Sequence, residues 1–337
     1  MDQQYTHRLE KIEKELKRWL PEPEAAGNEW AANVFGDNLN SYMGILAEPG
    51  RDLFSRGGKR WRPLLMTLIC EALGGGEISV PLVPLVEFSH NASLIHDDIE
   101  DNSDERRGKP AVHIIYGIDS AINSGSFLYF LPLTCIDSWA EQNNIDAKII
   151  IKVYALWGKY MRKLHLGQAM DIHWHRHFDS IPSVEDYLTM CALKTGCLAR
   201  FAAELGALVA GTENSQHLCE AAEKLGVGFQ ILDDVKNLTT GLPGKKRGDD
   251  IVEGKKSLPV LLFLQRNPEK IKDVRYCFTA AGSGGICVPE VENLIQSLLS
   301  AGVVNEAEEQ GKKLITDARS TFTGAGPLLA GFADLIM

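Results

Sequence analysis

The amino-acid sequence predicts an all-α protein, and three observations lead to this fold class. Apolar residues recur in alternating steps of three and four, which places them on one face of a helix. One such series is Leu85, Phe88, Ala92, Ile95 and Ile99. The two-residue alternation typical of strands is scarce, and clusters of Gly, Pro and polar residues punctuate the helical pattern. We therefore expect roughly ten or more helices.

Turn-forming segments divide the chain into expected helical stretches, because Gly, Pro and short polar residues stop a regular helix. These segments are 21–28, 73–81, 141–146, 239–250 and 281–290. Helices are expected before, between and after them, in the stretches 1–20, 29–72, 82–140, 147–238, 251–280 and 291–337. No shift in composition, flexible linker or fixed-period repeat divides the chain. We expect one domain over residues 1–337.

Composition limits the kind of protein. The chain has 337 residues with 45% apolar content, enough for a large core. A net charge of -10 and a pI near 5.4 argue against nucleic acid as a partner. The N-terminus lacks a signal-peptide core, and no apolar run is long enough for an integral membrane segment. With 7 cysteines and no CxxC pair, reduced thiols and a cytoplasmic location are expected.

A first acidic cluster follows an apolar helical run and consists of Asp97, Asp98 and Asp101. Asp97 and Asp101 share a helix face, where like charges repel by about 0.2–0.5 kcal/mol on a free helix and by more when buried. Carboxylates are hard oxygen ligands suited to Mg²⁺. The alternative is a solvated acidic helix end, which is the commoner explanation for such a motif in isolation.

A second acidic cluster changes this balance. Asp233 and Asp234 again follow an apolar run, and Asn237 takes the third place of the motif. Facing helices that each contribute an aspartate cluster could clamp several Mg²⁺ ions around a diphosphate. Together the two clusters predict metal binding.

A diphosphate also needs cations from the protein, and an acidic chain must supply them locally. Basic groups occur at Lys59, Arg60 and Arg62, at Arg106 and Arg107, at Lys194 and within residues 245–256. Arginine forks suit bidentate phosphate contacts, and lysine supplies a mobile point charge. A charge run alone is usually a solvated face, but these groups lie beside acidic motifs or at helix starts. This favours diphosphate binding over a P-loop, whose spacing is missing from GLPGKKRG.

These motifs resemble the trans-isoprenyl diphosphate synthases, also called the polyprenyl synthetase family. The resemblance lies in GKRWRP, DDIED followed by RRGKP, the pair Lys194 and Thr195, and GFQILDD. HNASLIHDDIEDNSDERRGKPAVHIIYGI, LHLGQAMDIHW and DDVKN are most similar to geranylgeranyl diphosphate synthases of eukaryotic type. The resemblance implies an isoprenoid-synthase helical bundle around a deep central cavity, usually a homodimer. It implies head-to-tail condensation of isopentenyl diphosphate with a C5, C10 or C15 allylic diphosphate, giving mainly the C20 product.

The resemblance also assigns residues. It implies Mg²⁺, about three ions per active site, with ligands Asp97, Asp101 and Asp233 and the catalytic carboxylates Asp98 and Asp234 beside them. The isopentenyl diphosphate site would be Lys59, Arg62, His90 and Arg107. The allylic diphosphate site would be Arg106, Lys194, Thr195, Gln230, Lys245 and Lys255, with Lys194 also catalytic.

Two of these positions have alternatives. His90 lies two turns before Asp97 on the same helix face, and a lone helical histidine is more often a core residue. The resemblance favours a diphosphate contact. Asn237 stands where many relatives have a third aspartate, which removes one charge. Eukaryotic-type C20 synthases also carry asparagine there, so we do not interpret it as inactivation.

Product length is expected to depend on how far the tail can grow. By resemblance, Ala92 faces the tail five residues before the first aspartate, with Ser93 beside it. Both are small, which disfavours a C15 limit. The floor for a C20 product would be formed by Tyr129, Phe130 and His165, although the two aromatics could simply be core residues.

Three competing functions share part of this pattern. A longer-chain synthase has the same motifs and a deeper cavity. A class I terpene cyclase normally lacks the second acidic motif and the GKRxR cluster. A non-catalytic partner subunit of another synthase tends to lose an acidic motif or the basic residues, which this chain keeps.

Overall fold

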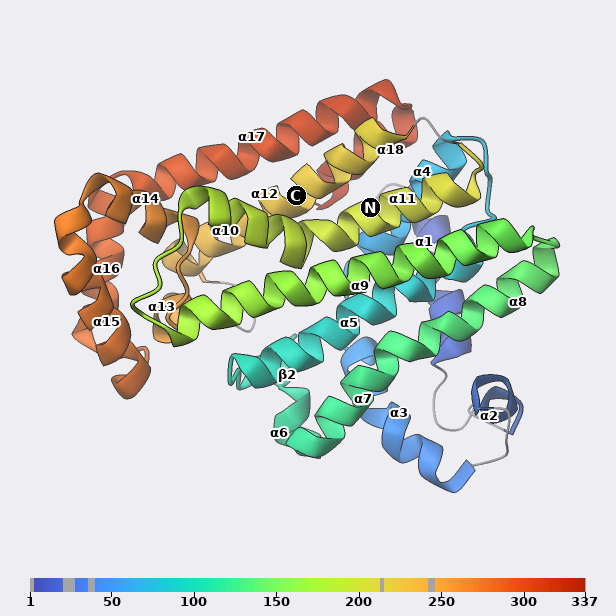
Figure 1. Ribbon diagram of the computed structural model, residues 1–337, viewed down its shortest axis with the longest axis horizontal. Coiled ribbons are helices and arrows are strands. Elements are labelled where there is room, and N and C mark those ends of the chain that lie inside the picture. Colours follow the sequence, from blue (N-terminus) through green and yellow to red (C-terminus); the bar gives the residue numbers. More distant parts are fainter. Residues whose placement is uncertain (1–2, 21–27, 36–39, 213–214, 242–245, 337) are drawn as a thin grey trace. The chain divides into compact units, whose positions relative to one another are not determined.

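A computed structural model of the protein describes residues 3–20, 28–35, 40–212, 215–241 and 246–336. These residues form helices joined by turns, with one two-stranded antiparallel sheet (Figure 1). The predicted all-α fold class is confirmed. None of the described helices has the length and the apolar character that a membrane crossing needs.

Contacts within the chain divide it into two compact units. Unit 1 contains Met1–Met161, Leu198–Cys219 and Thr321–Met337, and unit 2 contains Arg162–Cys197 and Glu220–Ser320. We describe each unit by itself. The expectation of a single domain over residues 1–337 stays a prediction.

Unit 1 is built from helices and a short hairpin. Its elements are α1 (Gln3–Trp19), α2 (Asn28–Phe35), α3 (Asn40–Ser55), α4 (Trp61–Ala72), η1 (Val80–Leu82), α5 (Val83–Glu100), β1 (Glu105–Arg106), β2 (Lys109–Pro110), α6 (Val112–Tyr116), α7 (Ile118–Phe130), η2 (Leu131–Leu133), α8 (Thr134–Asn143) and α18 (Pro327–Ile336). The helix α11 (Cys197–Val209) also belongs to it apart from its first residue.

Unit 2 contains the remaining helices. Its elements are α10 (Val184–Cys191), the π-helical turn η3 (Ala192–Gly196), α13 (Asp249–Val252), α14 (Leu258–Arg266), η4 (Pro268–Lys270), α15 (Ile271–Gly284) and α16 (Pro289–Ser300). Three helices have residues in both units: α9 (Ala147–Arg176), α12 (Gln216–Thr239) and α17 (Val303–Gly324).

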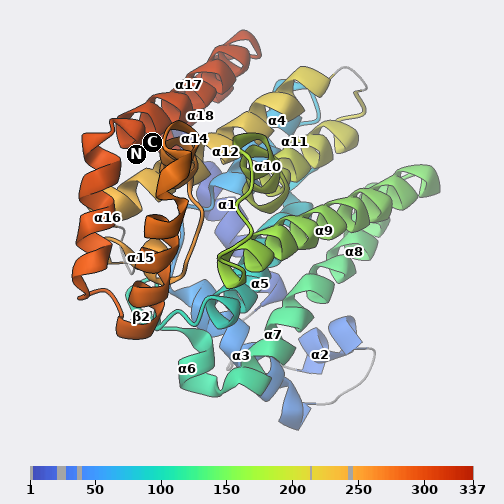
Figure 2. The same cartoon turned by 60° about the vertical axis from the view of Figure 1, so that its left-hand side comes forward.

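Helix α5 forms the centre of unit 1. It packs against α1, α3, α4, α6 and α7, and Figures 1 and 2 show it beside α7. A helix with neighbours on several sides must be apolar around most of its circumference. Of the predicted core positions, Leu85, Phe88, Ala92 and Ile95 are fully buried, whereas Ile99 near the end of the helix is only partly buried. The core therefore holds firmly the helix that carries the first acidic cluster.

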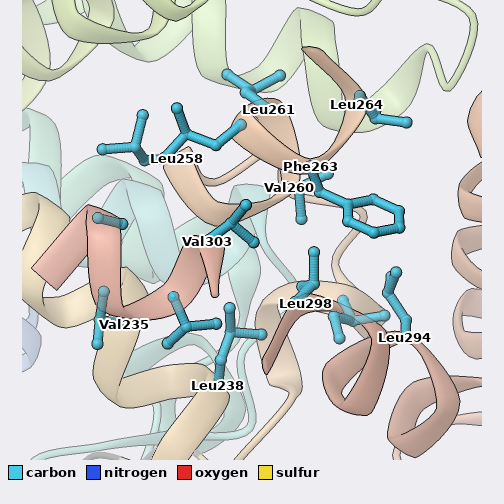
Figure 3. Packing of buried hydrophobic residues seen from close by; sticks show 14 of the residues in the cluster. Val235, Leu238, Leu258, Val260, Leu261, Phe263, Leu264, Leu294, Leu298 and Val303 are labelled. Atoms are coloured by element: carbon cyan, nitrogen blue, oxygen red, sulfur yellow. The ribbon is translucent and has the colours of Figure 1, made fainter. Parts of the chain in front are cut away.

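The core of unit 2 supports the second acidic cluster. Leucine, valine and phenylalanine side chains from α12, α14, α16 and α17 pack together there (Figure 3). Val235 and Leu238 belong to this cluster and are 5% and 1% exposed. Burying each such side chain contributes about 1.5–3 kcal/mol. The part of α12 that follows Asp233 and Asp234 is thereby fixed to the core.

Several predicted breaks coincide with helix ends. α8 ends at Asn143, within the predicted turn 141–146, and α9 begins at Ala147, directly after that turn. α15 ends at Gly284 and α16 begins at Pro289, within 281–290. Of the predicted turn 21–28, only Asn28 lies within the described residues, and it begins α2. The hairpin β1–β2 was not predicted, because its strands have only two residues each.

Candidate active site

Helix α5 carries the first acidic cluster at its C-terminal end. Asp101 caps the helix, and its N–H donates to the carbonyl oxygen of Asp97 at 2.8 Å. The two residues therefore lie one turn apart on the same face. Both are partly exposed, and the negative end of the helix dipole adds to their mutual repulsion. A cation bound here would relieve both effects.

Asp98 differs from its neighbours because it is fully buried. Its Oδ1 accepts hydrogen bonds from Nε of Arg106 at 2.8 Å and from Nη2 of the same residue. Burial raises the pKa of Asp98, and the charge of Arg106 opposes that rise. Asp98 thus holds Arg106 beside Asp97, whose Oδ2 lies 3.6 Å from Nη2 of the arginine.

The hairpin after α5 positions Arg106 and Arg107. Arg56, the residue that follows α3, fixes this hairpin, because its Nη1 donates to the carbonyl oxygens of Arg106 at 3.1 Å and Pro110 at 2.9 Å. Asp52 in turn accepts from Nη2 of Arg56 at 2.6 Å. Arg107 adopts φ of 54° and turns its side chain back toward α3. Sequence analysis missed Arg56, since nothing local distinguishes it from a surface arginine.

Arg62 and His90 are brought together in unit 1. Nη1 of Arg62 lies 3.3 Å from Nε2 of His90. Burial, followed by the charges of Arg62 and Arg107, lowers the pKa of His90 well below its usual value. Because an arginine can only donate, Nε2 of the neutral ring accepts and Nδ1 carries the proton. Lys59 lies three residues before Arg62 and is exposed.

Helix α12 carries the second acidic cluster in unit 2. Asp233 is exposed, whereas Asp234 is buried. Oδ2 of Asp234 accepts from the Tyr187 hydroxyl at 2.7 Å, and Oδ1 accepts from Nε2 of Gln230 at 3.0 Å. Burial and then the charge of Asp250 raise the pKa of Asp234 to about 7, against these two hydrogen bonds. A bound cation would favour the ionised carboxylate.

Lys194 and Thr195 lie on the π-helical turn η3. Thr195 donates to Oε1 of Gln230 at 2.7 Å, so a hydrogen-bonded chain runs from Thr195 through Gln230 to Asp234. Nζ of Lys194 lies 2.6 Å from Oδ2 of Asp171 on α9. Turns of this kind are frequent at functional sites. The turn therefore connects one predicted lysine to an acidic partner and the predicted threonine to the aspartate cluster.

Close backbone approach makes this arrangement possible. A Cβ atom on Gly167 would lie 2.4 Å from the backbone nitrogen of Lys194. A Cβ atom on Gly226 would lie 2.7 Å from Cα of Gly196. Neither contact can be tolerated, so only glycine lets α9 and α12 approach the turn so closely.

Asn237 has a structural role that its sequence position did not indicate. Its side chain is 1% exposed, and Oδ1 accepts the backbone N–H of Asp250 at 3.2 Å. Its own carbonyl oxygen accepts the N–H of Gly248 at 2.8 Å. The oxygen that would face a metal is therefore used to hold the turn at the start of α13. This turn carries the buried carboxylate of Asp250, whose charge acts on Asp234.

The predicted product-length residues have different surroundings. Ala92 is fully buried, and the ring of Tyr129 stacks on His96 with centroids 5.7 Å apart. Phe130 is 63% exposed, so the alternative that it is a core aromatic is excluded by its exposure. The Ser93 hydroxyl donates to the carbonyl oxygen of His90 at 2.8 Å. His165 lies in unit 2 and is exposed; the roles in product length stay predictions.

The predicted residues fall into two sets. Unit 1 holds Lys59, Arg62, His90, Ala92, Ser93, Asp97, Asp98, Asp101, Arg106, Arg107, Tyr129 and Phe130. Unit 2 holds His165, Lys194, Thr195, Gln230, Asp233, Asp234 and Lys255. Nζ of Lys255 lies 2.5 Å from Oε2 of Glu253. Lys245 lies outside the described residues.

The first acidic cluster on α5 and the second acidic cluster on α12 each suit a hard divalent cation that takes further ligands from a substrate. Oδ2 of Asp98 is buried and has no hydrogen-bond partner within the part of the chain that the structure describes. The residues Asp97 and Asp101 are partly exposed and Asp233 is exposed. Among the described residues, no group of three or more His, Cys, Asp or Glu side chains is arranged so that it could hold a metal ion without further ligands. Mg²⁺ typically binds through one or two carboxylates, waters and substrate phosphates.

Comparison with known proteins gives the same family as the motifs. The family model described as polyprenyl synthetase matches residues 43–294 of the chain. The chain belongs to the polyprenyl synthetase family. The resemblance predicted from the motifs is confirmed, and with it the class of trans-prenyltransferases.

Relatives within the polyprenyl synthetase family agree in fold and size. The chain is 37% identical over 226 residues to a geranylgeranyl pyrophosphate synthase of Eremothecium gossypii, covering 66% of this chain and 70% of that protein. It is 34% identical over 270 residues to a short chain isoprenyl diphosphate synthase of Methanocaldococcus jannaschii, covering 78% and 74%. The crystal structure of geranylgeranyl pyrophosphate synthetase from Pyrococcus horikoshii superimposes with a TM-score of 0.80 at 27% identity, covering 98% and 95%. The helical-bundle fold is confirmed.

We predict that Asn237→Asp destabilises the protein in the absence of Mg²⁺. The new carboxylate would be buried beside the turn that carries Asp250. It would also lie one helical turn from Asp234, whose pKa is already raised by burial and by the charge of Asp250. Adding an uncompensated buried charge should cost about 1–3 kcal/mol of unfolding free energy. Urea unfolding of the variant and the wild type measures this difference.

Asn237→Ala is the matched control for the hydrogen bond alone. It leaves the N–H of Asp250 without its acceptor but adds no charge, so its loss should not depend on Mg²⁺. An Asn237→Asp variant as stable as the wild type without Mg²⁺ would contradict the assigned structural role.

Proposed function

We propose that this protein is a geranylgeranyl diphosphate synthase, which condenses isopentenyl diphosphate head to tail with an allylic diphosphate. The observation that carries the proposal is the construction of the two acidic clusters. In each, one carboxylate is buried and held by fixed donors, namely Asp98 by Arg106 and Asp234 by Tyr187 and Gln230. Neighbouring carboxylates, such as those of Asp97 and Asp233, are more accessible. The C20 product length is supported by relatives named geranylgeranyl pyrophosphate synthases.

The proposed reaction breaks a carbon–oxygen bond of the allylic substrate. Mg²⁺, on which the family generally depends, would screen the charge of the diphosphate. Arg106 and Lys194 supply fixed positive charge for the departing diphosphate, and their carboxylate partners Asp98 and Asp171 hold them in place. Charges that are already in position need no reorganisation when the leaving group departs.

The isopentenyl double bond then attacks the allylic carbocation, forming a carbon–carbon bond. A proton leaves the new chain and restores a double bond, with the released diphosphate as its acceptor. Arg62 and the neutral ring of His90 would orient the isopentenyl diphosphate, together with Lys59 and Arg107. Because His90 is neutral, its Nδ1–H can donate to a phosphate oxygen without adding charge to the arginine cluster.

Product analysis tests this function directly. Purified protein with Mg²⁺, labelled isopentenyl diphosphate and each allylic primer should give a dominant C20 product. Asp97→Ala and Asp233→Ala should each lower turnover by about two orders of magnitude or more, while circular dichroism shows unchanged helicity. Longer products would indicate a longer-chain synthase, and no product with any primer would favour a non-catalytic partner subunit. Near-normal turnover in both variants would contradict the roles of the clusters.

The product-length residues make a separate prediction. If Tyr129 and Phe130 limit growth of the tail, replacing both with alanine should lengthen the main product by one or more C5 units. Chromatography of the dephosphorylated products measures this change. Trp157→Ala is the control, because its ring lies 6.3 Å from that of Phe130 but it is not a predicted limiting residue. An unchanged product distribution in an active double variant would place the limit elsewhere.

We also propose that the protein is a homodimer in which α6 and α7 form the contact. Ile114, Ile115, Ile118 and Ile122 are 56%, 47%, 57% and 45% exposed. Exposed apolar residues gathered in this way mark an interaction surface rather than a free one. A two-fold dimer would use the same patch on both copies.

Sedimentation should therefore show a dimer that the double change Ile118→Glu and Ile122→Glu converts to a monomer. Ile151→Glu is the control, since Ile151 is 66% exposed on α9 in the same unit and outside the patch. A monomeric wild type, or a double variant that remains dimeric, would rule out this contact.

A further inference from the structure

Arg60 differs from the two basic residues that surround it in GKRWRP. Lys59 is exposed and Arg62 is partly exposed, whereas Arg60 is only 4% exposed. Its guanidinium also lies over the ring of Phe54, 4.3 Å from the centroid. A guanidinium buried in this way contacts other groups of the protein and cannot contact a ligand that binds from solvent.

The donors of Arg60 are taken up by four acceptors of unit 1. Nε donates to Glu13 at 2.6 Å, and Nη1 donates to Glu87 at 2.9 Å and to the carbonyl oxygen of Gly57 at 3.3 Å. Nη2 donates to the carbonyl oxygen of Phe54 at 2.9 Å. A guanidinium has five N–H groups. Little of this side chain is left with which to bind a diphosphate.

Glu87 connects Arg60 to Arg107 across helix α5. It is 2% exposed, and its Oε1 also accepts from Nδ2 of Asn91 at 3.2 Å. Oδ1 of Asn91 in turn accepts from Nη1 of Arg107 at 3.3 Å. The carbonyl oxygen of Gly57 closes the network, since it accepts from Arg60 and from Arg107, the latter at 2.5 Å. The buried carboxylate of Glu87 thus holds two positively charged arginines near each other, Arg60 directly and Arg107 through Asn91.

The backbone at Arg60 shows that this network determines the local conformation. Arg60 has φ of 49° and ψ of 27°, a left-handed conformation that disfavours every residue with a Cβ atom. Such a conformation persists where the surroundings over-determine it, as the four hydrogen bonds do here. Arg60 is also the N-cap of α4, with no side-chain capping bond. Its conformation therefore sets how Lys59 leaves the turn and where the helix of Arg62 begins.

Gly58 supports the same arrangement. Its φ is 150°, and a Cβ atom there would lie 2.9 Å from Nη1 of Arg60 and 3.3 Å from Nη2 of Arg107. The absence of a side chain lets both guanidinium groups approach the turn. The turn of residues 57–60 is thus shaped around the two arginines.

We propose that Arg60, clamped by Glu87 and Glu13, is a positioning residue for the isopentenyl diphosphate site and does not itself contact substrate. It fixes the turn that presents Lys59 and Arg62, and through Glu87 and Asn91 it fixes Arg107. This inference rests on the proposed function. It assigns the clamp to one of the two substrates, because the residues that it holds are those proposed for isopentenyl diphosphate.

The test is steady-state kinetics with each substrate varied in turn. Glu87→Gln should raise the KM for isopentenyl diphosphate about tenfold, with kcat and the allylic KM changed less than about twofold. A change in KM alone reports lost binding that is equal in the ground state and the transition state. Equal changes for both substrates, or an unchanged KM in the folded variant, would overturn the inference.

A paired variant guards against simple misfolding. Arg60→Met with Glu87→Leu removes both buried charges at once, which proteins tolerate better than the loss of one partner. Asn91 keeps its hydrogen bond to the Glu87 backbone oxygen at 2.7 Å. The pair should fold and still show the raised KM for isopentenyl diphosphate; a normal KM would overturn the inference.

Arg8→Met is the matched control. Arg8 of α1 donates to Glu71 of α4 at 2.9 and 2.6 Å, so it also joins α1 to its neighbours but does not touch the turn. Its loss should lower stability without changing either KM. A raised KM for isopentenyl diphosphate in this control would show that general loosening of unit 1 explains the effect, against the inference.

A mutant cycle separates positioning from direct contact. In a Lys59→Ala and Arg62→Ala background, adding Glu87→Gln should raise the KM for isopentenyl diphosphate by less than the tenfold expected in the wild type, because Arg107 is then the one remaining residue on which the clamp can act and residues acting through one another are not additive. A full additional tenfold rise would overturn the inference. A wild type that forms no prenyl product would overturn the proposed function, whereas an active wild type with unchanged variants would overturn this inference alone.

Discussion

Each carboxylate that leaves water in this protein must find a fixed donor, and this requirement organises the polar side chains of both units. Asp98 obtains Arg106, Glu87 obtains Arg60, and Asp234 obtains Tyr187. Arg60 and Tyr187 are themselves buried, and Arg106 is partly buried. The members of each acidic cluster therefore have different roles. One buried carboxylate makes structural hydrogen bonds, and the more accessible carboxylates remain for a cation and a diphosphate.

Much of the fold and of the acidic clusters could be predicted because the information is local. The three-and-four spacing from Leu85 to Ile99 depends only on the geometry of one helix, and every position of the series except the partly buried Ile99 is fully buried. The shared face of Asp97 and Asp101 follows from the same geometry. The family resemblance, and not spacing, placed Arg62 and His90 in one site, and their side chains lie together in unit 1.

The rest could not be predicted because distant partners decide it. Lys59, Arg60 and Arg62 look alike in the sequence, and the burial of Arg60 depends on Glu87 and Glu13, 27 and 47 residues away. Tyr187 is likewise 47 residues from Asp234, and no pattern around it indicates a carboxylate partner. Asn237 was considered only as a position with one charge fewer than an aspartate. Its hydrogen bond to the Asp250 backbone joins residues on either side of a loop, and the sequence does not show that these residues come together. Asp171 lies within a segment that supported the family resemblance, but its pairing with Lys194 was not expected.

Helix α5 carries both Ala92, the predicted product-length position, and the acidic end five residues later. On a continuous helix, inserting or deleting one residue between them would turn one against the other by about 100° and shift it by about 1.5 Å. The helix therefore fixes the distance and the angle between the two positions, and neither can move along it without the other. An enzyme with this arrangement can change its product length by substituting side chains along the helix. A change in the number of residues between the two positions would instead displace the product-length position from the acidic cluster.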